Sequence, residues 1–337
     1  MDRLKACIEQ RVPFRKIVIT DDVTSYCCQQ EIVQFIQSQL SSNPHYFKNF
    51  LNVYINKLES FHEEIADSLY ELYVDPNILN SCELAADVVE NVKYYIGGIK
   101  EEVVDNERED GEIKEEAVAG FKTIIVKETP RLISAHCTTG LRTWEAALYL
   151  ANCLNDENIS SSILPFSLSD KTILELGCGT GLLGLSLLKK DLSNKLPSKV
   201  ILTDGSKEVF KNSRDIVKLN NLDPALVEWK QLQWGKHHTI SDHTDILVGA
   251  DITYDSRILK PLCQTIDSFF KHNGLTVAVV AATVRNLDTI AAWEAELANW
   301  FKGRWNITRR EKKPGSLNFI SYFDPNTPEI RIYSIFN

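Results

Sequence analysis

The chain has 337 residues, of which 44% are hydrophobic and 25% are charged, and its formal net charge at pH 7 is −9. These ordinary globular proportions exclude a disordered or collagen-like protein, and the length is sufficient for two domains. The acidic balance argues against broad, phosphate-driven binding to nucleic acid, which requires clustered Lys and Arg, so we expect no direct nucleic-acid partner.

The first residues carry no sign of secretion. Residues 1–14, MDRLKACIEQRVPF, lack the apolar core of a signal peptide. No apolar run along the chain reaches the roughly 18 residues that a membrane span needs. The eight cysteines are scattered, with no CxxC pair and no Cys/His spacing typical of zinc, so we expect reduced thiols and no metal. We expect a cytoplasmic protein that has no membrane partner and is a monomer.

Residues 1–98 are predicted to form a helical segment. Pro44 and the pair Asp75-Pro76 are suitable boundaries for a long helical stretch, and residues 31–40 and 79–95 are expected to form further helices. The segment shows no pattern of catalytic residues, so we expect it to support the rest of the chain or to recognise a substrate. The apolar residues that return at steps of three and four, as one helix face requires, are Phe47, Phe50, Leu51, Tyr54, Ile55, Leu58, Phe61, Ile65, Leu69 and Leu72.

An acidic stretch follows over residues 99–118. Gly97-Gly98 lead into the run EEVVDNEREDGEIKEE, which has little apolar content. Such runs stay solvated, so we interpret this stretch as a linker or loop. The alternative is a docking site for a basic partner.

Residues 119–337 alternate between predicted strands and helices. Near-continuous apolar strands joined by helices indicate a parallel sheet covered on both faces. The last two strands have no helix between them and are therefore expected to be antiparallel. The predicted fold is α/β and doubly wound, with an antiparallel C-terminal edge. The expected strands are residues 121–126, 172–176, 200–203, 227–232, 245–249, 275–282, 306–312 and 330–336, and the expected helices are 139–154, 181–190, 207–220, 257–271 and 286–301.

The strongest local signal is the glycine loop in residues 173–181, ILELGCGTG, where a strand passes through alternating glycines into a helix. Glycines let the backbone approach a ligand, and such a loop lies at the carboxyl end of a strand, where open α/β sheets bind ligands. Residues 179–184 also fit the GxGxxG pattern of dinucleotide-binding proteins, with Asp204 at the expected distance beyond them. The glycines alone therefore do not distinguish a nicotinamide dinucleotide from S-adenosylmethionine.

Three features favour S-adenosylmethionine. Glu175 stands two residues before the first glycine, where a carboxylate could hold the cationic methionine end and would repel a pyrophosphate. A strand and a helix containing Trp144 precede the loop. The fourth strand of the predicted sheet ends in VGADITY, which brings Asp251 and Tyr254 to the ligand edge.

Asp204 suits the same cofactor, because an acid at the end of the second strand can accept both ribose hydroxyls of an adenosine. The alternative for Asp204 is N-capping of the helix that starts near Ser206.

At this point three motifs resemble those of a known family. Residues 175–181, ELGCGTG, resemble the first motif of the seven-β-strand methyltransferases, which implies a seven-stranded, mostly parallel, Rossmann-like sheet over residues 119–337. Residues 140–147, GLRTWEAA, are similar to the Trp-bearing helix of family 16 within that group, the protein lysine methyltransferases. Residues 251–254, DITY, match the acid-x-x-aromatic motif of the same family.

The resemblance implies partners and site residues. The long N-terminal segment and the sequence around Trp144 are most similar to those of the elongation factor 2 lysine methyltransferases, which implies elongation factor 2 as the protein substrate. Asp204 would take the ribose, and Trp234 would pack near the adenine. The other residues implied to contact S-adenosylmethionine, besides Glu175, are Trp144, Gly177, Cys178, Gly179 and Ala250.

The catalytic residues are expected to be Asp251 and Tyr254. Methyl transfer needs a neutral amine, but a free lysine is only about 0.1% neutral at pH 7.4. Our hypothesis is that Asp251 receives the lysine ammonium and Tyr254 orients it, with Asp251 acting as a docking group because a carboxylate raises the pKa of a lysine. The alternative for Asp251 is the N-cap of the following helix. Alternatives for the whole chain are a small-molecule N-methyltransferase and an NAD(P)-dependent oxidoreductase with the same loop.

Overall fold

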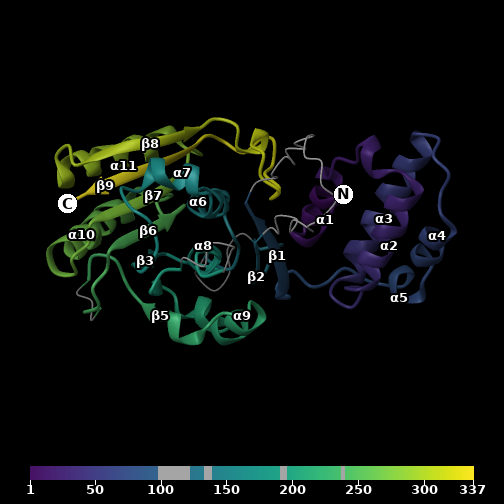
Figure 1. Ribbon diagram of the computed structural model, residues 1–337, viewed down its shortest axis with the longest axis horizontal. Coiled ribbons are helices and arrows are strands. Elements are labelled where there is room, and N and C mark those ends of the chain that lie inside the picture. The colour runs from purple at the N-terminus through teal and green to yellow at the C-terminus, as the bar shows by residue number, and fades with distance from the viewer. Residues whose placement is uncertain (98–121, 133–138, 190–195, 237–239) are drawn as a thin grey trace, which may run out of the picture.

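The computed structural model describes residues 1–97, 122–132, 139–189, 196–236 and 240–337. Figure 1 shows helices α2–α5 on one side of the molecule, the pair β1–β2 in the middle and the large sheet on the other side. The predicted acidic linker, residues 99–118, lies outside the described residues. Within the described ranges, no helix has both the length and the apolar character that crossing a membrane requires.

The N-terminal part is a small helical bundle, as the periodicity predicts. The long predicted stretch is broken near His62, whose φ of +59° is left-handed and cannot continue a helix. Most of the apolar residues predicted to line the helix face still form one buried cluster, including Phe47, Phe50 and Tyr54. The helices are α1 (Asp2–Glu9), α2 (Tyr26–Gln37), α3 (Pro44–Ser60), α4 (Asp67–Tyr73) and α5 (Pro76–Leu79).

The prediction of helix over residues 79–95 is wrong. Helix α5 ends at Leu79, and strand β1 (Glu90–Ile96) pairs antiparallel with β2 (Lys122–Glu128). In β1 every second residue is buried, from Glu90 to Ile96, which is the period of a strand with one face in the core. The sequence hides this strand because β2 lies more than twenty residues further along the chain.

The main sheet confirms the predicted fold class. Its seven strands stand in the order β5-β4-β3-β6-β7-β9-β8, so β5 and β8 form its two edges. Strands β3 to β7 of this sheet are parallel to one another, whereas β9 is antiparallel to both β7 and β8. A register shift interrupts the β8–β9 pairing between Ile307 and Arg309. The strands are β3 (Thr172–Leu176), β4 (Lys199–Asp204), β5 (Val227–Gln231), β6 (Ile246–Ala250), β7 (Val277–Thr283), β8 (Trp305–Glu311) and β9 (Ile330–Phe336).

Helices cover both faces of this sheet (Figure 1). Alternate strand residues enter two separate apolar clusters: Ile173 joins the cluster of α6 and α8, and Leu174 joins that of α10 and α11. The predicted helix 139–154 begins only after Trp144, and the predicted helix 207–220 is a 3₁₀ turn (Lys207–Phe210) followed by a separate α-helix. The helices are α6 (Glu145–Asn155), α7 (Glu157–Ile163), α8 (Leu182–Ser186), α9 (Ser213–Leu219), α10 (Ser256–His272) and α11 (Leu287–Phe301).

Polar contacts fasten the N-terminal helices to the rest of the chain. Glu90, the first residue of β1, accepts hydrogen bonds from Asn43 at 2.7 Å and from Arg131 at 3.2 Å. Gln10 exchanges two hydrogen bonds with the backbone of Tyr322, at 2.8 and 2.9 Å. The N-terminal segment is thus joined both to the β1–β2 pair and to the loop before β9.

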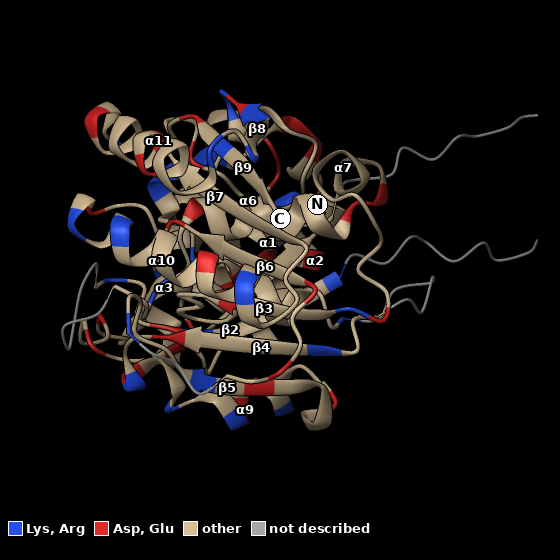
Figure 2. Cartoon of the chain, turned by 90° about the vertical axis from the view of Figure 1, so that its left-hand side faces the viewer, with Lys and Arg blue, Asp and Glu red and all other residues tan. Residues whose placement is uncertain are grey.

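In Figure 2, ribbon segments of basic residues are interspersed with those of acidic residues. The edge strand β5 carries residues of both signs, Glu228 and Lys230, and the other edge strand, β8, carries Arg309 and Arg310.

Candidate active site

A cavity of about 870 Å³ opens at the carboxyl ends of β3, β4 and β6, the edge at which parallel α/β sheets bind ligands. The structure brings all ten sequence-predicted site residues together in its lining. They are Trp144, Glu175, Gly177, Cys178, Gly179, Asp204, Trp234, Ala250, Asp251 and Tyr254.

The glycine loop forms one wall of this cavity. Gly177 and Gly179 have φ values of +62° and +50°, a region that residues with a side chain rarely adopt. A Cβ atom at Gly177 would lie 2.7 Å from the Ile252 side chain, and one at Gly179 would lie 3.1 Å from the Gly140 carbonyl oxygen. The absence of side chains therefore keeps the loop backbone accessible from the cavity.

Two acids stand beside this loop. Glu175 is only 2% exposed, and its carboxyl accepts a hydrogen bond from the Gly184 amide at 2.8 Å. Burial, aided by the charge of Asp204, raises the pKa of Glu175 to about 8. Asp204 accepts from the amides of Gly179 at 3.2 Å and Ser206 at 2.8 Å, and burial raises its pKa. These bonds leave the Asp204 carboxylate with acceptor capacity for a ligand hydroxyl.

Asp204 does not cap the next helical turn. The N-cap of the 3₁₀ turn beginning at Lys207 is Ser206, whose hydroxyl accepts from the Glu208 amide at 3.2 Å. The carboxylate instead connects the end of β4 to the glycine loop.

Two tryptophans line the same cavity. Trp144 is fixed by a hydrogen bond from its indole nitrogen to the Thr139 carbonyl at 3.0 Å. The indole nitrogen of Trp234 is buried and has no hydrogen-bond partner among the described residues. An unpaired buried donor at a cavity wall is energetically costly, and a polar ligand atom or water could satisfy it.

These groups fit an adenosyl sulfonium better than a pyrophosphate. Asp204 suits a ribose diol, and its carboxylate would repel phosphate groups, whereas a bound cation would lower the pKa of Glu175 and favour its charged form. Burial raises the pKa of Cys178 far above its ordinary value, so its thiol stays protonated and is a poor nucleophile. Cys178 is therefore a packing residue of the loop.

Asp251 lies at the end of β6 with a left-handed φ of +52°. Its side chain is 5% exposed. Oδ1 accepts from the Thr283 amide at 2.9 Å, and Oδ2 accepts from the Thr283 hydroxyl at 3.0 Å and the Ala146 amide at 3.2 Å. The carboxylate thereby ties together the ends of β6 and β7 and the first turn of α6.

The alternative that Asp251 caps the following helix is wrong. Helix α10 is capped by Asp255, whose carboxylate accepts from the Arg257 amide at 2.9 Å. Tyr254, in contrast, projects at the mouth of the cavity with 60% of its surface exposed.

The sequence reasoning missed Arg285, which lines this cavity, and its ion-pair partner Glu145. The Arg285 guanidinium forms a bidentate ion pair with Asp251, at 3.1 and 3.2 Å, and a second ion pair with Glu145. It also lies 5.1 Å from the centre of the Trp144 ring. Its position two residues after a buried strand, at the ligand edge of the sheet, was the available signal.

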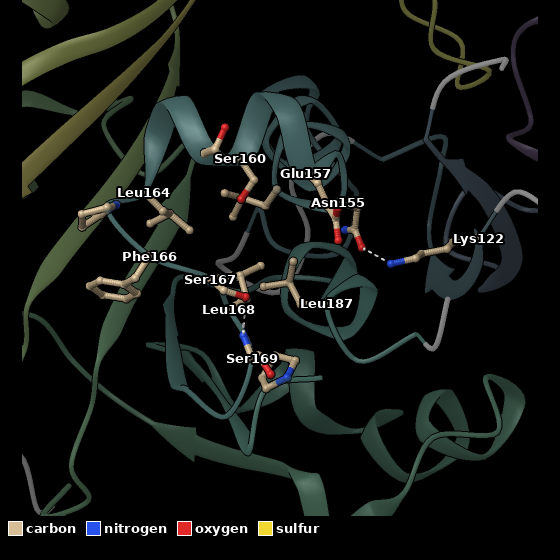
Figure 3. A pocket seen from close by; sticks show the side chains of 14 residues that line it. Lys122, Asn155, Glu157, Ser160, Leu164, Phe166, Ser167, Leu168, Ser169 and Leu187 are labelled. Atoms are coloured by element: carbon tan, nitrogen blue, oxygen red, sulfur yellow. Dashed lines mark hydrogen bonds between the residues drawn. The ribbon is translucent and has the colours of Figure 1, made fainter. Parts of the chain in front are cut away.

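A second hollow, of about 380 Å³, does not have the groups that such a ligand needs. It lies beside α7 and the segments that lead into β3 and β4, at the amino ends of these strands. Figure 3 shows Lys122 reaching Asn155, at 3.0 Å, and several serines around an apolar floor that includes Phe166. Glu157 is the one carboxylate in its described lining, and no glycine loop borders it.

Comparison with known proteins finds similar chains among the lysine methyltransferases. Residues 133–290 match a family described as lysine methyltransferase. The chain is 27% identical to the protein-lysine N-methyltransferase EFM3 of Saccharomyces cerevisiae over 80% of this chain and 76% of that protein. It is 38% identical to the protein of the same name from Chaetomium thermophilum over 49% of each chain. It is 27% identical to the human protein-lysine N-methyltransferase EEF2KMT over 80% of this chain and 74% of that protein.

Proposed function

The chain belongs to the lysine methyltransferase family and uses S-adenosylmethionine, and from this premise we propose that it methylates a lysine of translation elongation factor 2. The observation that carries the proposal is the cavity in which Glu175, Asp204 and two tryptophans surround the glycine loop. When bound there, S-adenosylmethionine supplies a methyl group activated by a positive sulfur. The NAD(P)-dependent alternative has no support from the comparisons.

Each predicted cofactor residue has a proposed task. Asp204 accepts the ribose hydroxyls, and Glu175 faces the cationic methionine end. The backbone of residues 177–179 contacts the cofactor, as does Ala250 at the end of β6. Trp234 and Trp144 cover the adenine side and the mouth, respectively. These tasks are supported by the cavity that all of these residues line.

The transfer itself requires a neutral lysine held in line with the methyl carbon. The lysine ammonium would first lose a proton to water, and its nitrogen lone pair would then accept the methyl group that S-adenosylmethionine supplies. The electron pair of the broken C–S bond would stay on sulfur, and the nitrogen would carry the positive charge. Positioning of this kind supplies roughly 7–11 kcal/mol of barrier reduction, so a strong base is not needed.

We propose that Tyr254 and Asp251 receive this lysine. Tyr254 is exposed at the mouth and can wall the aliphatic chain. Asp251 faces the same cavity, but its carboxylate is already bonded on several sides, so it shapes the place where the lysine side chain docks and does not take the proton. The N-terminal helices, which adjoin the loop before β9, are proposed to help recognise the protein substrate.

The choice of elongation factor 2 is supported by the resemblance of the Trp144 segment and of the long N-terminal segment, and by the human relative named above. Because translation elongation runs in the cytoplasm, we place the reaction there, and we expect the enzyme to act as a monomer.

A labelling experiment tests this function. Purified chain, purified elongation factor 2 and radiolabelled S-adenosylmethionine are incubated together, and mass spectrometry then locates the modified lysine. We expect label on elongation factor 2 with the wild-type chain and none with Asp204→Ala, which lacks the proposed ribose acceptor. Label only on another lysate protein would reject elongation factor 2 as the substrate. Label only in small molecules would support the small-molecule alternative, and failure to bind S-adenosylmethionine would reject the cofactor site.

A further inference from the structure

The Asp251 carboxylate has no free position for a lysine ammonium. Besides the bonds from Thr283 and Ala146, it accepts two from the Arg285 guanidinium, at 3.1 and 3.2 Å, which makes five donors in all. A carboxylate offers about four lone-pair sites, so its hydrogen-bonding capacity is saturated. Its charge also has a permanent partner, since a guanidinium does not lose its proton in proteins.

Arg285 belongs to a small cluster of charges around Trp144. The guanidinium groups of Arg285 and Arg142 lie 5.1 and 5.4 Å from the centre of the Trp144 ring, and Arg285 also pairs with Glu145. Two carboxylates and two guanidinium groups thus stand around one ring, and their formal charges cancel. The other titratable groups that line the cavity are Glu175, Cys178, Asp204 and Tyr254.

We infer that Arg285 is a positioning residue that cancels the charge of Asp251 beside the incoming lysine, and so lets that lysine lose its proton near neutral pH. The inference rests on the proposed function, because it concerns the amine that the enzyme methylates. An unpaired carboxylate a few ångströms away would raise the pKa of the lysine by about 1–3 units and keep it in the unreactive form. The ion pair removes most of this effect while retaining Asp251 as the anchor between β6, β7 and α6.

The geometry explains why an arginine suits this place. Its planar fork matches both Asp251 oxygens at once, and its charge lies over the Trp144 ring. Burial acts to lower the pKa of Arg285, but the charges of Asp251 and Glu145 outweigh this and raise it. The guanidinium therefore stays charged over the whole range in which the enzyme works.

The test is the pH dependence of kcat on elongation factor 2, measured from pH 6 to 10 for the wild type, Arg285→Gln and Arg285→Lys. Both variants lose the bidentate geometry, but only glutamine loses the charge. We expect the midpoint of the Arg285→Gln profile to move up by about one pH unit, which is a tenfold loss of rate near pH 7 that disappears at high pH. Arg285→Lys should keep the wild-type midpoint.

A matched control is Arg257→Gln, which removes a cation from a surface ion pair with Asp255 close to the same mouth. It should leave the midpoint unchanged. Calorimetric binding of S-adenosylmethionine identifies any variant that has failed to fold.

Two results would overturn the inference. An equal loss in both Arg285 variants at every pH would leave Arg285 a structural role only. A faster reaction of Arg285→Gln at every pH would show that the guanidinium competes with the lysine for its place. If the wild-type chain does not methylate elongation factor 2, the substrate proposal fails instead, and the same pH series is then run on the protein that the wild type labels in lysate.

Discussion

Asp251 joins three elements through one side chain, and its loss should therefore be severe. In Asp251→Ala the Arg285 guanidinium and the amides of Thr283 and Ala146 lose their acceptor. Because the Arg285 side chain is 38% exposed, the loss of stability should stay below the about 3–5 kcal/mol that breaking a fully buried ion pair costs. We expect methylation to fall by about 100-fold or more, because the lysine loses its docking surface, while the Kd of S-adenosylmethionine changes only a few-fold.

Asp255→Ala is the matched control for that variant. It removes an acid four residues further along, which caps α10 and pairs with Arg257. This change should leave kcat close to the wild-type value. Wild-type kinetics in Asp251→Ala would remove Asp251 from the mechanism.

Glu175 should make the stability of the cofactor-free protein depend on pH. Folding raises its pKa from an ordinary value of 4.5 to about 8, so between these values the folded protein holds a proton that the unfolded chain has released. Stability from this group is therefore complete below about pH 4.5 and is lost as the pH rises toward 8. The loss should amount to a few kcal/mol.

The measurement compares urea unfolding of the wild type and Glu175→Gln at pH 5 and pH 8.5. Glutamine keeps an acceptor for the Gly184 amide but cannot ionise. The difference between the two proteins should move in favour of the variant as the pH rises. A constant difference would mean that Glu175 is ionised in the folded protein throughout.

For single residues, the sequence predicted well which of them share the cavity, but not which hydrogen-bond partners each one has. Every predicted site residue lines the cavity, because motifs at the carboxyl ends of parallel strands must converge. The bonds of Asp251 to Ala146 and Arg285 join residues more than 30 positions apart, and no local pattern encodes such a pairing.

The glycine loop is an element whose backbone conformation can be tested directly. Gly179→Ala places a Cβ at a φ of +50° and 3.1 Å from the Gly140 carbonyl oxygen. We expect the affinity for S-adenosylmethionine to fall by about tenfold or more, since the wall of the cavity must shift. Calorimetry measures this affinity.

Gly303→Ala is the control for backbone strain alone. Gly303 also has a positive φ, of +86°, but an added Cβ there meets nothing within 4 Å. This variant should lose about 1 kcal/mol of stability and keep its cofactor affinity. Equal affinity losses in the two variants would show that strain, and not the shape of the loop, is responsible.

Elements with a strong period and a clear boundary were predicted well, and short or paired ones were not. The long apolar strand β7 and helix α11, which begins at its Asn286 cap, lie close to their predicted limits. Strand β1 was missed because it is defined by its pairing with the distant strand β2. The break at His62 was missed because no local sequence pattern marks a residue other than glycine that adopts a left-handed backbone conformation.

Glu90 is at the centre of the polar contacts that attach the N-terminal helices to the rest of the molecule. Glu90→Ala leaves Asn43, Arg11 and Arg131 without their shared carboxylate in a buried setting. The cost should be about 3–5 kcal/mol, and it should appear as faster hydrogen exchange in helices α1–α3.

Asp215→Ala is the corresponding control, because it breaks an exposed ion pair between α9 and Lys127 of β2. Such surface pairs contribute little, so exchange in the N-terminal helices should not change. If Glu90→Ala also leaves exchange unchanged, the helices are held mainly by their apolar contacts.

The sheet edges have a consequence for how copies of this protein behave together. An uncovered edge strand can recruit another strand through its unpaired backbone groups, the first step of ribbon-like aggregation. Here β5 carries Glu228 and Lys230 in ion pairs with Lys199 and Asp242, and the register of β8 is interrupted near Arg309. Another strand would have to dehydrate these charges and match an irregular partner. The protein should therefore stay dispersed at high concentration without polymerising along its own sheet.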